Sequence, residues 1–580
     1  MKTETVRARC LEIMEAALRA YDETDIRSWF DEVKRTGLKE HGFPRLCADI
    51  GILLCHGRAA GLRSLFCDMM TFCCAQVSVR QHVANDFSIK ELVFALLECE
   101  ASGRFDRSLT EAWRSSLAAF DPWTGYDCIA PSDTAEVGNW ADYNMASEYM
   151  RGYAGLCDPS EFLRHQMPSQ LCRFDENGMY RDPHEPMLYD AAARCQLAVL
   201  LRFGYTGEYA DRIDGLLRRA GPCTLSAQSV TGELPFGGRS NQFLFNEAYV
   251  CALCAYEASR YRRLGRPVTA ECYDAAAMRA CDAILAWAEP DDASGGLRFS
   301  SHLRNRFPHD SGIGCEGYAY FKKYMISLAS FIYLAFLFSD DGDHVTPPAI
   351  AALDAALAAV TQTSPYFHKT YMRVGEWFLE FDTDADPHYD ANGLGRIHRV
   401  GVPSALCLST PIPEKPSYRI ASPNPGALAF GEGLPTDDGS LFIFDKAQGI
   451  HTDMSWSLSV EAAERDKAVL RSRTTMPGGR TVTAVYTLTP DGLIVTVTGQ
   501  GTVLYALPVL IFDGAEHTSW RQETGRLTVS YRGARAVYET DGAIMDTGSN
   551  YANRNGIYRR FEAARECSLT VRIRLEPSGS

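Results

Sequence analysis

Apolar positions recur every three or four residues over about the first 370 residues of the chain, which is the periodicity of helices. Glycine- and proline-rich segments separate one apolar run from the next. Several runs are apolar nearly all round, so we expect an inner layer of helices covered by an outer amphipathic layer. Successive inner candidates lie about 50 residues apart, which favours helix pairs arranged around a ring or in an open array. Clear helical runs lie at residues 188–202, 241–264, 269–288, 318–338 and 348–360.

The pattern changes at six prolines between residues 403 and 425, since proline continues neither a helix nor a central strand. Alternating, β-branched runs follow, separated by Pro-Asp-Gly and Gly-Gly turns, at residues 441–444, 481–488, 493–498, 504–512, 527–531 and 569–575. Helices followed by strands predict separate domains rather than one mixed sheet. We therefore predict an α+β multidomain protein, with an N-terminal (α/α) toroid followed by a C-terminal antiparallel β-sandwich. The expected boundaries are 1–375 for the toroid, 376–425 for a linker and interdomain seam, and 426–580 for the β-sandwich.

The composition is that of a folded protein, since 46% of the 580 residues are apolar and 23% are charged. Lysine and arginine number 58 against 73 aspartates and glutamates, which gives a net charge of −15. An acidic chain repels a phosphate backbone, so we expect no nucleic-acid partner. One pocket can still be locally basic, and an acidic sugar therefore remains a candidate ligand.

Cysteines are numerous and unevenly placed: 18 of the 19 lie before residue 408. An odd number without regular spacing is a poor disulfide framework, so we expect reduced thiols that are mostly buried as small apolar side chains. The first residues run into an amphipathic helix without an apolar signal segment, from which we expect a cytoplasmic location. Residues 324–338 form a charge-free apolar segment too short to cross a bilayer, so we predict a core helix and no membrane partner.

Common cofactor and metal motifs are absent or out of context. Residues 312–317 match the dinucleotide-binding pattern by letter, but Pro308 and charged residues precede them instead of a hydrophobic strand. Cys251 and Cys254 have the spacing of a metal or redox pair, but no second pair accompanies them. We therefore expect no cofactor and no metal.

The segment 237–249 places polar residues in an apolar setting. A Gly-Gly loop and Ser240 lead into the predicted helix, on which Gln242, Asn246 and Tyr249 have i, i+4 and i+7 spacing. Buried amides and phenols need partners, so this stripe predicts either a hydrogen-bond network between helices or the floor of a cavity. In the second case a helix N-terminus and a cation can hold a carboxylate. The candidates here are Arg239, Asn241, Gln242, Asn246, Glu247 and Tyr249.

Two further clusters stand at loops. Residues 304–324 repeat the arrangement of a glycine-rich loop opening an apolar helix, with Arg306, His309, Tyr318 and Tyr320 as candidates. Tyr320 and Tyr324 are expected on one helix face, where a core role is the alternative for each tyrosine. In the interdomain seam, His398 stands between Arg396 and Arg399, whose charges favour a neutral imidazole that can act as a base. A solvated basic loop is the alternative.

Carboxylates and aromatic residues form a last set of candidates. Trp140 lies among acidic residues and is a candidate for sugar binding. Carboxylates near Trp140 and His184 could form the acid/base pair of a glycosidase, cap helices or lie in solvent. His368 and Tyr371 are additional candidates. The acidic residues are Asp133, Glu136, Asp142, Asp182, Glu185 and Asp190.

The candidate residues include the kinds of side chain that β-elimination from a uronate requires. Hydrogen bonds from Asn, Gln or Arg stabilise the charge that develops on the carboxylate when the C5 proton leaves. A His or Tyr takes that proton, and a Tyr or His protonates the departing O4. No metal is required.

The architecture and these segments resemble the heparinase II/III-like polysaccharide lyases, which pair an (α/α) toroid with antiparallel β-sheets; a more distant toroid lyase type acting on glucuronate linked to rhamnose fits equally well. The resemblance implies an Asn that neutralises the carboxylate and a Tyr and a His that transfer protons. Carried onto this chain, these are Asn241 or Asn246, Tyr318 or Tyr320, and His309 or His398. The candidates for substrate binding are Trp140, Arg239, Gln242, Glu247, Tyr249, Arg306 and Arg396.

A cytoplasmic enzyme would meet an imported uronate-containing oligosaccharide rather than a long polymer. Two other functions fit the same residues: a toroid glycoside hydrolase acting on glucuronides, and a carbohydrate-binding protein without catalysis. The sequence does not indicate the oligomeric state.

Overall fold

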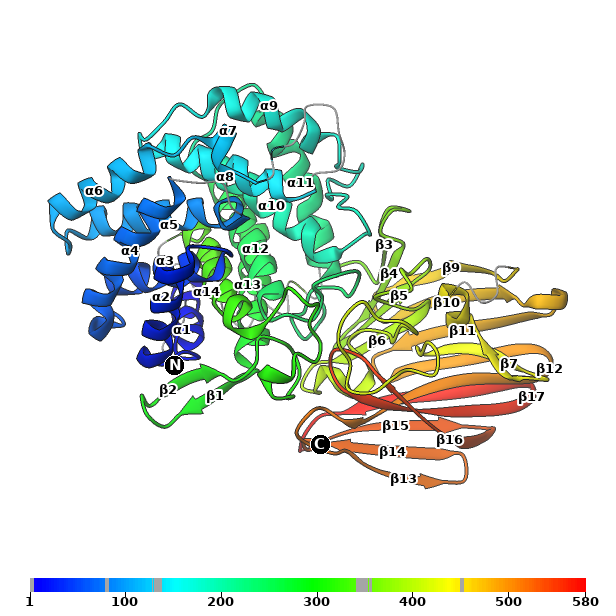
Figure 1. Cartoon of the computed structure of the whole chain (residues 1–580). Helices are drawn as coiled ribbons and strands as arrows, with labels where there is room; N and C mark the ends of the chain where they lie inside the picture. The colour runs from blue at the N-terminus through cyan, green and yellow to red at the C-terminus, as the bar shows by residue number, and fades with distance from the viewer. Residues whose placement is uncertain are drawn as a thin grey trace.

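The computed structural model describes residues 5–78, 83–127, 129, 138–340, 353, 357–448 and 453–579. Helices fill the N-terminal part of the chain and strands fill the C-terminal part, as Figure 1 shows. The helices are α1 (Val6–Leu18), α2 (Glu23–Thr36), α3 (Gly42–Cys55), α4 (Arg63–Val77), α5 (Val83–Ser102), α6 (Arg107–Ala118), α7 (Pro122–Gly125), α8 (Trp140–Tyr153), α9 (Ser160–Leu171), α10 (Met187–Arg202), α11 (Ala210–Ala227), α12 (Phe245–Arg263), α13 (Pro267–Leu285) and α14 (Phe321–Phe338).

Within the described residues, six helices form a closed ring. In the order α3, α5, α8, α10, α12 and α14, each packs against the next, and α14 packs back against α3. The ring helices are enclosed on all sides; in α12 every residue from Phe245 to Arg260 is buried. Helices α1, α4, α9, α11 and α13 pack on the outside of the ring. The predicted two-layer (α/α) toroid is therefore confirmed, and the arrangement is a ring rather than an open array.

Helix α14 is the most apolar element of the ring. By length and composition it could cross a membrane, but 72% of its apolar window is buried inside the protein. It packs against α1, α3 and α12, so apolar side chains on all its faces have protein neighbours. This placement agrees with the predicted core helix.

Antiparallel strands form the second domain. The strands are β1 (Ala288–Asp291), β2 (Gly296–Phe299), β3 (Val360–Gln362), β4 (Lys369–Val374), β5 (Trp377–Asp382), β6 (Gly393–Arg399), β7 (Gly431–Thr436), β8 (Gly439–Phe442), β9 (Ser455–Glu464), β10 (Lys467–Thr475), β11 (Thr481–Thr489), β12 (Gly492–Phe512), β13 (Ser519–Glu523), β14 (Arg526–Tyr531), β15 (Ala534–Thr540), β16 (Ala543–Ala552) and β17 (Ile557–Glu576). The hairpin β1–β2 extends from the toroid, where β2 contacts α1.

Two sheets make up the β domain in the described part of the chain. Strands β3 to β6 form a four-stranded sheet, and an 11-stranded sheet is centred on β12 and β17. Strand β4 packs against β10 and β11, and one hydrophobic core joins Trp377 and Phe381 of the small sheet to Leu470 and Val495 of the large one. The predicted antiparallel sandwich is thus confirmed.

Several predicted element boundaries differ from the structure. Residues 493–498 and 504–512 belong to the single strand β12, because β17 pairs along both segments. Strand β8 ends at Phe442, and the last two residues of the predicted run 441–444 lie in a 3₁₀ turn. The helix predicted at 348–360 lies largely outside the described residues, and its last residue begins β3.

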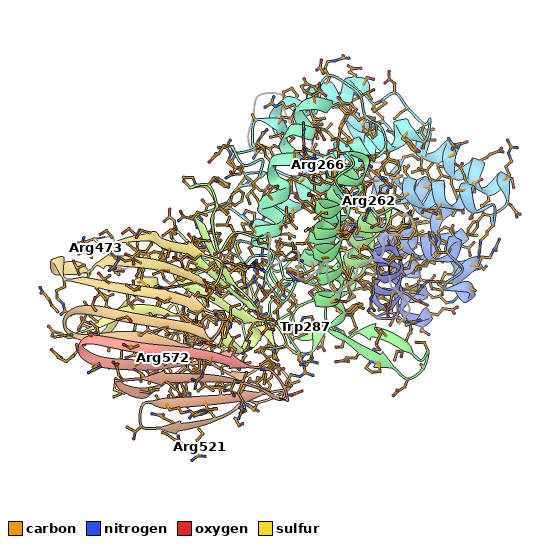
Figure 2. All side chains as sticks on the ribbon, turned by 180° about the vertical axis from the view of Figure 1, so that it is seen from behind. Arg262, Arg266, Trp287, Arg473, Arg521 and Arg572 are labelled. Atoms are coloured by element: carbon orange, nitrogen blue, oxygen red, sulfur yellow. The ribbon has the colours of Figure 1, made fainter. Side chains whose placement is uncertain are left out.

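Strands also occupy the expected interdomain seam. Strands β3 and β4 lie before residue 375, and β5 and β6 lie between residues 377 and 399, so the first half of the expected seam is folded into the small sheet instead of forming a linker. The small sheet lies between the toroid and the large sheet (Figure 1). Figure 2 shows Trp287 where the two domains meet, and Arg473, Arg521 and Arg572 on the β domain away from the toroid.

Candidate functional site

A cavity of about 380 Å³ lies where the six ring helices begin. The residues that line it come from the first turns of these helices or from the loops just before them, apart from deeper positions on α14. The backbone N–H groups of a helix start carry positive partial charge, so a cavity formed by six helix starts favours an anion. The lining residues are Glu40, His41, Arg45, Phe87, Asn139, Trp140, Tyr143, Leu188, Tyr189, Arg239, Phe245, Tyr249, Tyr318, Lys323, Tyr324, Ser327 and Phe331.

Aromatic rings form much of the cavity wall. The Tyr249 ring stacks on Phe331 at 4.4 Å between centroids, and Trp140 meets Phe87 edge-on at 5.0 Å. Hydroxyl groups of Tyr143 and Tyr249 bond to each other. Aromatic walls with a few placed polar groups are typical of small-molecule sites.

Arg239 and Asn139 are held side by side by one buried carboxylate. Arg239 Nη2 donates to Asp182 Oδ2 at 2.6 Å, and the guanidinium lies 4.6 Å above the Tyr189 ring. Asn139 donates to Asp182 Oδ1 from its backbone N at 3.0 Å and from Nδ2 at 3.1 Å. Asp182 is fully buried, whereas the Arg239 side chain keeps 29% of its surface exposed. The pair can therefore present donors to an anionic ligand in the cavity.

A second polar group in the cavity is His41, the residue before α3. Arg45 Nη1 lies 2.8 Å from His41 Nδ1, and because a guanidinium only donates, Nδ1 accepts and the imidazole proton lies on Nε2. Burial lowers the pKa of His41 well below its ordinary value, and the charges of Arg45 and Lys323 lower it further. His41 is therefore a neutral hydrogen-bond donor.

Lys323 is another side chain of the cavity wall whose pKa is altered. Burial lowers the pKa of Lys323, with the Glu40 carboxylate acting against it and Arg45 adding to it. Its Nζ lies 5.2 Å from the centre of the Tyr324 ring. A half-buried lysine with a lowered pKa has more neutral amine available to accept a proton.

Three hydroxyl groups form a row along one side of the cavity. Ser240 Oγ lies 2.9 Å from Tyr189 Oη and 2.9 Å from Tyr318 Oη. Desolvation of their hydroxyl groups raises the pKa of both tyrosines, although the Tyr318 ring is partly exposed, so both stay protonated and can donate. Ser240 itself has a φ of 57°, a left-handed conformation that non-glycine residues rarely adopt.

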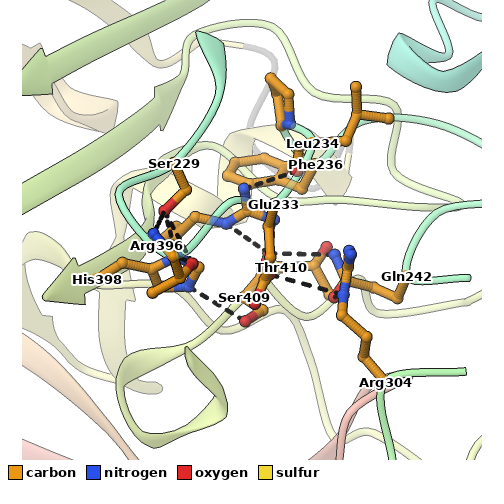
Figure 3. A network of polar contacts seen from close by, with 12 residues as sticks. Ser229, Glu233, Leu234, Phe236, Gln242, Arg304, Arg396, His398, Ser409 and Thr410 are labelled. Atoms are coloured by element: carbon orange, nitrogen blue, oxygen red, sulfur yellow. Dashed lines mark hydrogen bonds and ion pairs between the residues drawn. The ribbon is translucent and has the colours of Figure 1, made fainter. Parts of the chain in front are cut away.

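The structure divides the residues singled out from the sequence into groups. Four of them, Trp140, Arg239, Tyr249 and Tyr318, line the cavity. Residues Asn241, Gln242, Glu247, Arg396 and His398 lie in a different place, a buried polar network at the domain interface that Figure 3 shows in part.

The interface network joins the two domains through charged and amide groups. Arg304 pairs with Glu247 and donates from Nε to Gln242 Oε1 at 3.2 Å. Gln242 in turn donates to Asn241 Oδ1. Arg396 donates from Nη2 to the Ser409 carbonyl at 2.7 Å and pairs with Glu380 at 3.2 Å. The alternative interpretation of the 237–249 segment, a hydrogen-bond network, therefore describes these amides.

The expected polar stripe on one helix face is wrong. Helix α12 begins at Phe245, and Gln242 has a φ of 66°, so Gln242 does not share a helix face with Asn246 and Tyr249. Asn246 is fully buried, and its amide atoms have no hydrogen-bond partner among the described residues. It does not line the cavity.

Residues of the 304–324 cluster also separate. Tyr320 precedes α14 and is 46% exposed, so it does not share a face with Tyr324, which lies on the cavity wall. His309 lies in an exposed turn and stacks on Phe321 at 4.1 Å. Arg306 lines a different cavity at the domain boundary, 3.6 Å from Asp513.

His398 lies on β6 and is buried, so the solvated loop considered for it is wrong. Burial, with Arg396 and Arg304, lowers the pKa of His398 to about 3 against the opposing charge of Glu233. The expected neutral imidazole is therefore present. Its Nδ1 lies 2.8 Å from Ser229 Oγ and its Nε2 lies 3.2 Å from Ser409 Oγ, away from the cavity.

Among the described residues, none of the acids considered as a glycosidase pair lines the cavity. Asp133 and Glu136 lie outside the described residues. Asp142 is buried, Asp190 pairs with Arg194, Asp182 pairs with Arg239, and Glu185 pairs with His368. Among the described lining residues, Glu40 is the one carboxylate. Tyr371 is buried against Phe378 of the small sheet.

Comparison with known proteins gives matches in structure alone. No protein-family model matches the chain, and neither does any curated protein. Heparinase III matches with a TM-score of 0.37 at 8% identity, over 86% of this chain and 78% of that chain. The heparan sulfate lyase HepC from Pedobacter heparinus matches with a TM-score of 0.32 at 9% identity, over 96% and 88%. A glycosyl hydrolase of family 88 from Bacteroides vulgatus matches with a TM-score of 0.34 at 11% identity, over 57% and 100%.

Proposed function

We propose that this protein cleaves uronate-containing oligosaccharides by β-elimination in the toroid cavity. The observation that carries the proposal is the combination, in one cavity, of six helix starts, the Arg239–Asn139 donor pair and the hydroxyl row. The helix starts and the donor pair suit a carboxylate, and the aromatic wall suits the apolar faces of sugar rings.

Each step of the elimination has a group to perform it. Arg239 and Asn139 bind the uronate carboxylate and stabilise the negative charge that develops on it. Lys323, as the neutral amine, takes the C5 proton, and the electron pair of the C5–H bond delocalises onto the carboxylate. This pair then forms the C4–C5 double bond as the C4–O4 bond breaks, and O4 leaves with the C4–O4 electron pair and takes the proton of Tyr318. Water protonates Tyr318 again and takes the proton from Lys323.

The two proton-transfer groups lie at the same end of the cavity. The Tyr318 ring is 6.1 Å from the Tyr324 ring, which is also the ring beneath Lys323 Nζ. The hydroxyl row links Tyr318 to Tyr189, over which Arg239 lies. A sugar bound between these groups would meet the anion-binding pair and both proton-transfer groups.

Screening uronate oligosaccharides tests the reaction directly. Elimination leaves a conjugated 4,5-unsaturated product that absorbs in the ultraviolet, and hydrolysis does not. We expect ultraviolet absorption to rise with at least one uronate oligosaccharide, and no turnover of the same compound after its carboxyl group is reduced to an alcohol. New reducing ends without ultraviolet absorption would instead show a hydrolase, and binding without turnover would show a carbohydrate-binding protein.

Tyr318→Phe tests the proposed acid. Removing the hydroxyl is expected to lower kcat by about 100-fold or more, the usual contribution of a general acid. Tyr320→Phe is the matched control, because Tyr320 lies two residues away with similar exposure but does not line the cavity. Equal losses in both variants, measured as initial rates of ultraviolet absorption, would place the acid elsewhere.

A further inference from the structure

Arg554 reaches from the β domain to a carboxylate of the toroid. It lies in the loop between β16 and β17 and is almost fully buried. Its Nη1 donates to Glu316 Oε2 at 3.1 Å and its Nη2 donates to Glu316 Oε1 at 2.6 Å, while the Gly314 carbonyl also accepts from Nη1. The guanidinium lies 3.8 Å from the centre of the Tyr418 ring. This two-point contact fixes the orientation of the Glu316 carboxylate.

Glu316 connects Arg554 to the hydroxyl row of the cavity. Its Oε1 accepts a hydrogen bond from the Ser240 backbone N at 2.7 Å. Ser240 is the central member of the hydroxyl row, and its left-handed backbone conformation is costly for a residue with a side chain. A bond to its N–H from a fixed carboxylate helps to keep Ser240 Oγ between the two tyrosine hydroxyls.

We infer that Arg554 is a positioning residue of the cavity: it acts through Glu316 and Ser240 to hold the Tyr318 hydroxyl, so the β domain completes a site formed by toroid side chains. The inference rests on the proposed function, in which Tyr318 protonates the leaving group. Without Arg554, the buried Glu316 carboxylate would lose its charged partner and would rotate toward water. Ser240 would then be released.

Substitutions at Arg554 test whether this residue positions the Tyr318 hydroxyl or only helps to hold the two domains together. Arg554→Gln is expected to lower kcat by about 10- to 100-fold, with a smaller change in KM, because a displaced catalytic group costs rate at this scale. Arg554→Lys keeps the charge without the two-point contact and should recover part of the loss. Arg559→Gln is the control, since Arg559 follows five residues later and pairs with Asp546 away from the toroid.

The route through Ser240 is tested by combining substitutions. If Arg554 acts through Ser240, Arg554→Gln will reduce kcat much less in a Ser240→Ala background than in the wild type. Losses that multiply independently would overturn the inference, as would wild-type kcat in a folded Arg554→Gln protein. A wild type without ultraviolet product on any uronate would count against the proposed function instead.

A measurement that does not depend on turnover tests the positioning role of Arg554 separately from the proposed reaction. Nitration of tyrosines by tetranitromethane, followed by mass spectrometry, compares Tyr318 with Tyr320 in the same loop, where both are partly exposed. We expect the Tyr318 to Tyr320 ratio to rise in Arg554→Gln and to stay at its wild-type value in Arg559→Gln. An unchanged ratio in a folded Arg554→Gln protein would show that Arg554 does not position Tyr318, whatever the reaction is.

Discussion

Lys323 and Lys322 are neighbours in sequence that meet different surroundings. Lys323 lines the cavity, and burial lowers its pKa. Lys322 keeps 40% of its side chain exposed, lies over Trp29 and is 3.6 Å from Glu32. One residue step at the start of α14 therefore separates a candidate base from an ordinary surface lysine.

This difference predicts a pH dependence of the reaction. If Lys323 is the base, only its neutral form acts, so kcat rises with pH through a pKa below the ordinary lysine value of about 10.5. Lys323→Met should lower kcat by about 100-fold or more and remove this rise. The check is kcat measured between about pH 6 and about pH 10.

Lys322→Met is the control for that profile. It removes a charge from the same helix turn without touching the cavity, so kcat and its rise with pH should stay as in the wild type. A rise that persists in Lys323→Met would assign the base to another group.

At the scale of helices, the toroid depends on close contact between its two layers. Gly51 on α3 faces Phe66 on α4, and a Cβ at this position would lie 2.5 Å from the Phe66 ring. Gly51→Ala is therefore expected to lower the free energy of unfolding by about 1–3 kcal/mol through overpacking. Thermal unfolding midpoints measure the effect.

Gly61→Ala provides the comparison for this substitution. A Cβ at Gly61 meets no atom within 4 Å, and the position does not require a left-handed backbone. Alanine there should leave stability unchanged or raise it by up to about 1 kcal/mol, because it restricts the unfolded chain. If both variants unfolded alike, the two helical layers would be packed less closely than described.

Element types follow from local periodicity, whereas element ends depend on distant contacts. The helical pattern at 188–202 predicts α10 to within one residue, because burial on all sides is visible in the apolar run itself. The start of α12 is misplaced, because Ser240 and Gln242 take left-handed conformations while bonded to Glu316 and Arg304. No short-range signal reports such partners.

The residues that line the cavity are likewise only partly predictable from local sequence patterns. Arg239 and Tyr318 are recognisable because they stand at loops that open apolar helices. His41 is missed, because a single polar residue before an apolar helix has no distinguishing pattern. Lys323 lies within the 304–324 cluster, but the sequence does not show that it, rather than Lys322, lines the cavity. Asn241 and His398 look equally functional in sequence, but the fold places them in the interface network, where Asn241 bonds to Gln242 and His398 lies beside Ser409.

At the scale of the whole molecule, ion pairs and hydrogen bonds of charged side chains join the toroid to the β domain. Glu316 of the toroid meets Arg554, Glu185 meets His368, and the Phe236 N–H meets Glu380. Separating the domains would break these contacts, and breaking the Arg554–Glu316 pair is strongly destabilising because both charges are buried. The interface is therefore expected to hold one arrangement of the domains over the cavity.

His368 makes part of this interface dependent on pH. It contacts Asp382 of β5 through Nδ1 and lies 2.9 Å from Glu185 of the toroid through Nε2. Burial alone would lower its pKa, but the Asp382 and Glu185 carboxylates outweigh burial and raise the pKa of His368 to about 9. Since the folded-state pKa exceeds the ordinary value of about 6.5, the stabilisation is full below that pH and is lost as pH rises to about 9.

His368→Gln should consequently destabilise the protein most under mildly acidic conditions. The loss is up to about 3 kcal/mol near pH 6 and shrinks as pH rises past 9, because the wild-type imidazolium is then neutral as well. Thermal unfolding midpoints across this range measure the difference, with His388→Gln as the control, since His388 is 62% exposed beside Asp386. A difference between wild type and His368→Gln that stays constant with pH would mean that His368 contributes through packing alone and that its charge does not join the two domains.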